Sequence, residues 1–401
     1  MKIKIYILFL LALIHFQPCK AQQSQTTLPK IENYTKGELE IKVVPFDLDN
    51  PISIGKVTAD GTIHFNFPET HLGTTDETPF YSTQKIGRAV GMFVCHDKEI
   101  EENTETVTVI EVKDIFLYKY GQQVGALLRA TEKEEIENKF RIGSSTLSWF
   151  LSSGKGVFKA TCIAYEGDGL GKGGLDKNNL ANKTSYDISF KKGWNIVEHK
   201  LLKTKVLEDD RGKFSRRLIE EKTSVANIPN TIKWYLKYWA NDEYLEIEHQ
   251  LVKQVPISKE RYETWLPNKL GNLKRAAYEI GKDLERMPTL NNIELLFEKG
   301  SKKATVTIVD CAQNKEAASV YTLMLDMASR DWKDKTETGY RSAEKMDDKR
   351  VMIEYNEKEA KTLLSYNAND RFLIKVDATN VKPEELWEAL KSLDFEKLIE
   401  K

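Results

Sequence analysis

Short runs in which apolar and polar residues alternate recur through the first half of the chain, and turn-forming residues separate them. In the segment from Gly61 to Phe67, the side chains of Ile63, Phe65 and Phe67 fall on one face. A period of two is the pattern of a half-buried strand. Many short strands of this kind predict an antiparallel β-sandwich, and we place this domain at residues 36–255.

Two further segments predict β-hairpins within this domain. In residues 116–128, Gly121 stands between two strand-like runs. In residues 186–197, Gly193 follows two lysines and separates one strand-like run from the next. Glycine accepts the positive φ that tight turns need, which favours a direct reversal of the chain at both places.

The spacing of apolar residues changes in residues 259–401. A linker near Pro256 is expected to precede this segment. Residues 314–329 carry apolar side chains at helical spacing, and a second helix is expected to begin at Pro383. Strand patterns surround both helices. We therefore predict the fold class α+β, in which the sandwich precedes an α+β domain with an antiparallel sheet and two main helices on one sheet face. The length of 401 residues agrees with two domains.

The first 21 residues have the pattern of a secretory signal peptide. Lys2 and Lys4 precede a short apolar run, and Ala21 offers a small residue for cleavage. Residues 22–35 predict a flexible leader. We expect an exported protein, periplasmic or secreted, and a lipid anchor on Cys19 is the less favoured alternative. No later apolar run is long enough to span a membrane.

Cleavage after Ala21 removes three lysines and lowers the formal charge from −1 to −4. A charge near zero gives no field that attracts nucleic acid, so no nucleic-acid partner is expected. The cleaved chain keeps Cys95, Cys162 and Cys311. Because this number is odd, at least one thiol is free or forms an intermolecular bond, and the sequence leaves the pairing open.

Motifs that would carry catalysis or hold a metal or cofactor are weak. Cys95-His96-Asp97 offers three ligand types, but adjacent residues on a strand point to opposite faces. Residues 169–174 match the spacing of a dinucleotide-binding loop, yet no strand–turn–helix unit surrounds them. We therefore expect no metal and no cofactor, and no catalytic residue can be named.

The best binding candidates are four aromatic residues close together in the sequence: Trp234, Tyr235, Tyr238 and Trp239. Exposed aromatic rings stack on sugars or anchor protein partners, whereas buried ones belong to a core. The sequence supports both interpretations.

Residues 265–401 resemble an uncharacterised domain of exported bacterial proteins. The segments WLPNKLGNLKR, VTIVDCA, TETGYR and NDRFLIKVDATNVKPEELWEALKSLDFEKL carry this resemblance. The domain is also loosely similar to anti-sigma-factor-like and lipoprotein-carrier-like domains of the envelope. The segments YDISFKKGWNIV and VTADGTIHFNFP are similar to recurring parts of bacterial surface β-sandwich modules. The resemblance implies an envelope protein and transfers no catalytic residue.

Taken together, these observations predict an exported, non-enzymatic envelope protein that binds a protein partner or a small apolar or carbohydrate ligand. Two alternatives stay open: a carrier of an apolar ligand, and a hydrolase whose residues meet only in three dimensions. A cleft with converging polar groups would favour the hydrolase, and a long apolar cavity would favour the carrier.

Overall fold

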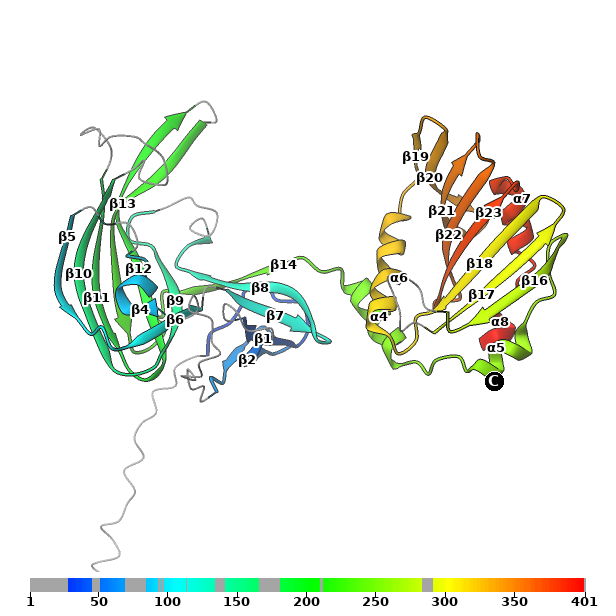
Figure 1. Cartoon of the computed structure of the whole chain (residues 1–401). Helices are drawn as coiled ribbons and strands as arrows, with labels where there is room; N and C mark the ends of the chain where they lie inside the picture. The colour runs from blue at the N-terminus through cyan, green and yellow to red at the C-terminus, as the bar shows by residue number, and fades with distance from the viewer. Residues whose placement is uncertain are drawn as a thin grey trace, which may run out of the picture. The chain divides into compact units, whose positions relative to one another are not determined.

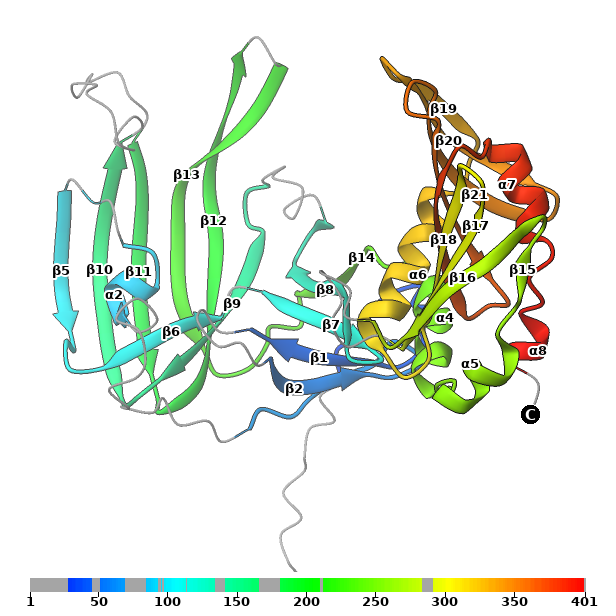
Figure 2. The same cartoon turned by 45° about the vertical axis from the view of Figure 1, so that its right-hand side comes forward.

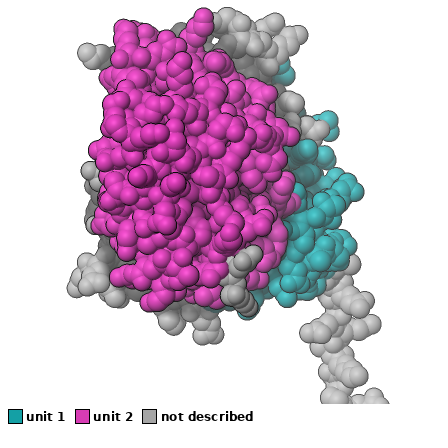
Figure 3. All heavy atoms as spheres, turned by 90° about the vertical axis from the view of Figure 1, so that its right-hand side faces the viewer, with its two compact units in different colours: residues 1–239 teal, residues 240–401 magenta. Residues whose placement is uncertain are grey.

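The computed structural model describes residues 28–44, 51–68, 84–92, 95, 97–112, 114–133, 141–165, 181–209, 212–282 and 291–399. The chain is mostly β and forms two compact units, residues 1–239 and 240–401, coloured separately in Figure 3. The predicted signal peptide, residues 22–27 of the predicted leader, His96 and residues 169–174 lie outside the described residues.

Most of the described residues of the first unit lie in strands (Figure 1). Its elements are β1 (Leu39–Val43), β2 (Ile52–Val57), β3 (Ile63–Phe65), β4 (Gln84–Lys85), α2 (Ile86–Ala89), β5 (Asp97–Asn103), β6 (Thr108–Val112), β7 (Ile115–Lys119), β8 (Gln122–Ala130), β9 (Ser145–Ser152), β10 (Gly156–Tyr165), β11 (Ala181–Phe190), β12 (Gly193–Asp209), β13 (Gly212–Val225) and β14 (Lys233–Tyr238).

These strands form one hydrogen-bonded path instead of two separate antiparallel sheets. The path runs β3-β2-β1-β7-β8-β9-β12-β13-β11-β10-β5, with β14 paired to β8, β6 paired to β9 and β4 paired to β6. The pair β11–β13 is parallel, and the other strand pairs are antiparallel. The expectation of a wholly antiparallel sandwich is therefore wrong at β11–β13, where two strands distant in sequence pair side by side.

One end of this path closes on itself. Residues 29–31 bridge β14 on one side, through Ile31 and Trp234, and the start of β3 on the other, through Lys30 and Thr62. The amide of Ile31 donates to the carbonyl of Gly61 (3.0 Å). We call the resulting closed set of strands β3, β2, β1, β7, β8, β14 and residues 29–31 the strand ring. Ile31 is 3% exposed, so the end of the predicted flexible leader is part of the fold.

The other end of the path is a curved sheet made of β9, β12, β13, β11, β10 and β5, which Figure 2 shows side by side. Helix α2 and strand β6 pack Ile86 and Val109 against the inner face, where Phe150, Phe158 and Ile188 are buried. A disulfide joins Cys95 to Cys162 on β10, and their Cα atoms are 5.4 Å apart. That distance is typical of disulfides.

The predicted hairpin at residues 186–197 is wrong, although both of its strands exist. Strand β13 lies between β11 and β12 and pairs with each of them. The connection through Lys191 and Lys192 therefore passes over the end of β13, and Gly193 adopts a φ of 88° where the new strand begins. By contrast, β7 and β8 form the hairpin predicted at residues 116–128.

The second unit is a nine-stranded antiparallel sheet of order β15-β16-β17-β18-β23-β22-β21-β20-β19. Its elements are α4 (Asp242–Lys253), α5 (Lys259–Trp265), β15 (Lys269–Leu270), β16 (Leu273–Ile280), β17 (Asn292–Lys299), β18 (Lys302–Asp310), α6 (Lys315–Met327), β19 (Trp332–Lys335), β20 (Gly339–Met346), β21 (Lys349–Asn356), β22 (Lys361–Ala368), β23 (Phe372–Thr379), α7 (Pro383–Leu390) and α8 (Glu396–Ile399).

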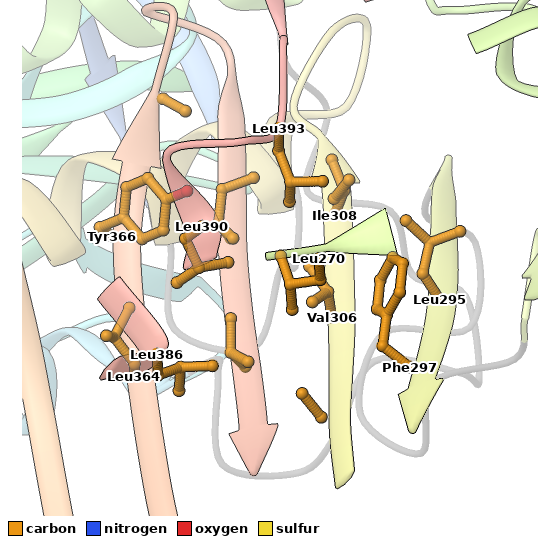
Figure 4. Close-up of a cluster of buried hydrophobic side chains, with 14 of the residues drawn as sticks. Leu270, Leu295, Phe297, Val306, Ile308, Leu364, Tyr366, Leu386, Leu390 and Leu393 are labelled. Atoms are coloured by element: carbon orange, nitrogen blue, oxygen red, sulfur yellow. The ribbon is translucent and has the colours of Figure 1, made fainter. Parts of the chain in front are cut away.

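One face of this sheet carries the main core of the second unit. Alternate residues of the central strands meet side chains of α5, α7 and α8, and Figure 4 shows Leu386 beside Leu364 and Leu390 beside Tyr366. On the opposite face, α4 and α6 pack over Val309 and nearby residues. The two predicted helices are α6 and α7, but they lie on opposite faces, because the residues alternate along β18 and β23.

Helix α4 belongs to the second unit, so residues 240–255 do not extend the first domain as predicted. Asn241 caps its first turn by accepting hydrogen bonds from the amides of Glu243 and Tyr244. Its buried Glu248 accepts hydrogen bonds from hydroxyl groups of Ser319 and Thr322 on α6. These bonds attach α4 to α6 of the second unit.

Candidate functional site

The four aromatic residues of the predicted site are separated by the alternation of β14. Trp234 is 3% exposed and belongs to the core of the strand ring, whereas Trp239 is 49% exposed at the end of the first unit. Tyr235 is half-buried. Tyr238 is half-buried too, and the ammonium of Lys36 lies 4.3 Å from the centre of its ring. The four side chains therefore do not form one common surface.

Trp234 is instead the inner end of a row of aromatic rings, which we call the aromatic ladder. Trp234 contacts Trp149 (5.9 Å between ring centroids) and Phe65 (5.4 Å). Phe65 stacks on Phe67 (5.4 Å, 7° between planes), and Phe67 contacts Trp194 (5.0 Å). The ladder runs from buried Trp149 and Trp234 to half-buried Phe67 and Trp194.

The outer end of the aromatic ladder lines a cleft of about 970 Å³, which we call the aromatic cleft. Its walls come from the end of β11, the start of β12, the end of β13, and Phe67 and Pro68 in the segment that follows β3. The cleft therefore lies where the β11–β12 connection passes over the end of β13. Trp149, Phe67 and Trp194 supply the aromatic part of its wall.

Hydrogen bonds hold the polar part of the cleft in place. The side chain of buried Asn195 accepts from the amide of Lys191 (2.9 Å) and donates to the carbonyls of Lys191 and Gly193 (both 2.8 Å). The indole N–H of Trp194 donates to the carbonyl of Pro68 (3.1 Å). Because these bonds orient both the connection and the indole ring, the cleft is formed before any ligand arrives.

The cleft is positively charged. Lys191 and Lys192 are exposed at its rim, and among the described residues that line it, none is Asp or Glu. Ser189 and Ser224 add polar groups beside them, and the amide of Ser189 donates to the hydroxyl of Ser224 (2.9 Å). The cleft thus combines aromatic faces, a hydroxyl group and two ammonium groups.

Two buried donors lie at the inner end of the aromatic ladder. The indole N–H groups of Trp149 and Trp234 have no hydrogen-bond partner among the described residues. A buried donor without an acceptor destabilises the fold, and such groups are common at functional sites. The guanidinium of Arg129 lies 4.8 Å from the centre of the Trp149 ring and donates to the carbonyl of Leu147 (2.9 Å).

A second hollow of about 520 Å³ lies beside residues 29–36 and is lined by Trp234 and Tyr235. Lysine side chains surround it, but Lys30 pairs with Asp60 (3.0 Å) and Lys36 lies over Tyr238. Residues 29–36 close the strand ring at this place. We therefore assign this hollow to the closure of the ring.

Charged groups also gather on the inner face of the curved sheet. His199 on β12 lies opposite Lys222 on β13, and the ammonium of Lys222 donates to the carbonyl of Val90 at the end of α2 (2.7 Å). Burial, together with the smaller effect of the nearby charges of Lys222 and Arg217, lowers the pKa of His199 to about 3. His199 is therefore neutral, and this cluster attaches α2 to the sheet.

The metal-ligand motif at Cys95 does not exist in the folded chain, because Cys95 is bonded to Cys162. Across the described ranges, no three His, Cys, Asp or Glu side chains come close enough to hold a metal ion. In the same part of the chain, no helix has the length and apolar character needed to cross a membrane.

Sequence reasoning missed Trp194 and Phe67 as site residues. Both were treated as strand residues, and a signal for Phe67 was present in the alternation of Ile63, Phe65 and Phe67. The meeting of Phe67 with Trp194 had no local signal, because more than one hundred residues separate them. The chain matches no family model, no curated protein and no solved structure.

Proposed function

We propose that this chain is an exported, non-enzymatic binding protein of the bacterial envelope, and that its first unit binds a small ligand in the aromatic cleft. The single observation that carries the proposal is the meeting of Phe67 and Trp194 in a cleft of about 970 Å³. Its volume lies near the upper end of the range of small-molecule sites. The aromatic walls supply apolar contact area, and the serines and lysines supply orientation.

Two observations support export. The first 21 residues have the charge and apolar pattern of a signal peptide. The disulfide between Cys95 and Cys162 is a bond that persists in oxidising compartments and is rare in the cytosol. Both fit the periplasm or the cell exterior.

The binding proposal is tested by thermal unfolding of the mature chain in the presence of oligosaccharides and small aromatic compounds. A ligand that binds only the folded state stabilises it and therefore raises Tm. The gain in the free energy of unfolding is about 2.7 kcal/mol when the free ligand concentration is one hundred times Kd. We expect Trp194→Ala and Phe67→Ala to abolish the increase. Trp239→Ala is the matched control, because Trp239 is exposed and lies outside the cleft.

Two results would overturn this proposal. One is a set of ligands whose effect on Tm survives both Trp194→Ala and Phe67→Ala. The other is the absence of any stabilising compound in the screen, with wild-type protein shown to be folded by circular dichroism.

Export is tested separately, by expressing the full chain in a Gram-negative host and measuring the intact mass of the envelope fraction. Cleavage after Ala21 would give a chain that begins at Gln22. A lipid anchor would give a chain that begins at Cys19 and carries the added mass of acyl groups. A full-length chain in the cytosol would contradict export.

A further inference from the structure

The proposed function does not name the ligand. The chemistry of the aromatic cleft restricts the chemical class to which the ligand can belong. We infer, resting on that proposed function, that the ligand is an acidic oligosaccharide: a short chain of sugar rings that carries carboxylate groups. Three features of the cleft lead to this class: its aromatic faces, its charge and the rigid connection that carries its lysines.

The aromatic faces match the apolar faces of sugar rings. The indole N–H of Trp194 already donates to the carbonyl of Pro68 (3.1 Å), so the ring offers its faces and edges to a ligand. Phe67 lies beside it, with 38° between the ring planes. Two neighbouring rings that are tilted against each other give two contact surfaces, one for each of two consecutive sugar rings.

The charge of the cleft favours an anionic ligand. Lys191 and Lys192 are exposed on the connection between β11 and β12, and the described residues that line the cleft include no carboxylate. An ammonium beside a carboxylate of the ligand gains a charge-assisted hydrogen bond. A neutral sugar would leave both ammonium groups without this gain.

The connection between β11 and β12 is held in place by hydrogen bonds. Its two lysines therefore have fixed backbone positions, which favours a specific binding site. The side chain of Asn195 makes three hydrogen bonds to the backbone of Lys191 and Gly193. The backbone positions of both lysines are therefore set relative to Trp194. Ser224, which accepts from the amide of Ser189 (2.9 Å), can donate its hydroxyl hydrogen to an oxygen atom of the sugar.

The experiment compares two probes by calorimetry on the mature chain: a tetramer of galacturonic acid and a neutral galactose tetramer of the same linkage. At about 50 mM salt, we expect the acidic tetramer to bind about tenfold more tightly. At about 500 mM salt, screening is expected to remove most of this difference.

The matched variants separate charge from stacking. Lys191→Gln with Lys192→Gln is expected to remove the preference for the acidic tetramer and to leave the weaker neutral binding unchanged. Lys233→Gln with Lys237→Gln changes the net charge of the chain equally, on exposed residues of β14 outside the aromatic cleft, and is expected to keep the preference. Trp194→Ala is expected to abolish binding of both tetramers.

Equal affinities of the acidic and neutral tetramers would overturn the inference and leave the proposed binding function intact. A preference that survives Lys191→Gln with Lys192→Gln would overturn it too, because the charge would then act elsewhere. If neither tetramer binds while another compound stabilises the protein through Trp194, the ligand class is wrong and the cleft is still a binding site.

Discussion

Arg371 and Asp310 form a bidentate ion pair at one end of the second sheet. The guanidinium donates to both carboxylate oxygens (2.7 and 2.8 Å), and the Asp310 side chain is fully buried. The pair also holds the backbone between α4 and α5. Arg371 donates to the carbonyl of Val255 (2.6 Å), and Asp310 accepts from the amide of Ile257 (2.8 Å). The predicted linker at Pro256 is therefore bound to the sheet.

Replacement of one partner is expected to destabilise the second unit strongly. Asp310→Ala leaves the Arg371 guanidinium buried without its counter-charge, and such changes cost about 3–5 kcal/mol. Urea unfolding followed by circular dichroism measures the loss. The control is Arg341→Ala, which removes an exposed pair with Glu354 and should cost less than about 1 kcal/mol. Equal effects of the two changes would contradict this role for Arg371 and Asp310.

His199 is expected to make stability depend on pH. Its pKa is lowered to about 3 in the folded chain, and an unfolded histidine has a pKa near 6.5. The unfolded state therefore binds a proton first as the pH falls, so stability is complete above pH 6.5 and decreases between pH 6.5 and 3. By pH 5 the loss from this group reaches up to about 2 kcal/mol.

The measurement compares the urea midpoint at pH 7.5 and pH 5 in wild type and in His199→Asn. The variant is expected to lose less stability over this interval, by up to about 2 kcal/mol. Identical pH dependence in both proteins would show that folding does not lower the pKa of His199.

The cysteines are expected to differ in reactivity. Cys311 is buried, and burial together with the charge of Asp310 raises the pKa of its thiol to about 12. In a chain that begins at Gln22, a thiol reagent should find no fast-reacting thiol in the native state, one after unfolding, and three after unfolding with a reductant. Two reactive thiols without a reductant would contradict the disulfide between Cys95 and Cys162.

The same disulfide is expected to stabilise the first unit. The bond closes a loop of 67 residues, so its removal in Cys95→Ser with Cys162→Ser should cost about 4 kcal/mol. Cys311→Ser tests whether loss of a thiol alone has this effect. This substitution should change the stability of the second unit and leave that of the first unit unchanged. A double variant as stable as wild type would show that the bond adds nothing to the fold.

Closure of the strand ring by residues 29–31 is tested at Ile31. Ile31→Ala removes a buried side chain between β3 and β14 and should cost about 2–5 kcal/mol. Leu28 lies three residues earlier and is 53% exposed, so Leu28→Ala should change stability by less than about 0.5 kcal/mol. A similar small effect of both changes would mean that the ring is closed without this residue.

Several elements could be predicted because their signal is local. The alternation at Ile63 and Phe65, the turn at Gly121 and the start of α7 at Pro383 all depend on residues within a few positions. Helix α4 was missed, although Asn241 as N-cap signalled its start and Leu245 and Leu251 lie on its buried face. Its charged composition hid the apolar stripe.

By itself the sequence determined the β-rich composition, the positions of most strands and turns, and two of the helices, because backbone preferences and burial alternation act over short distances. Only the tertiary structure decided that β13 lies between β11 and β12, that residues 29–31 close the strand ring, and that Phe67 meets Trp194. These relationships join residues far apart in the chain. Their stability comes from packing and pairing between distant strands, which no local pattern records.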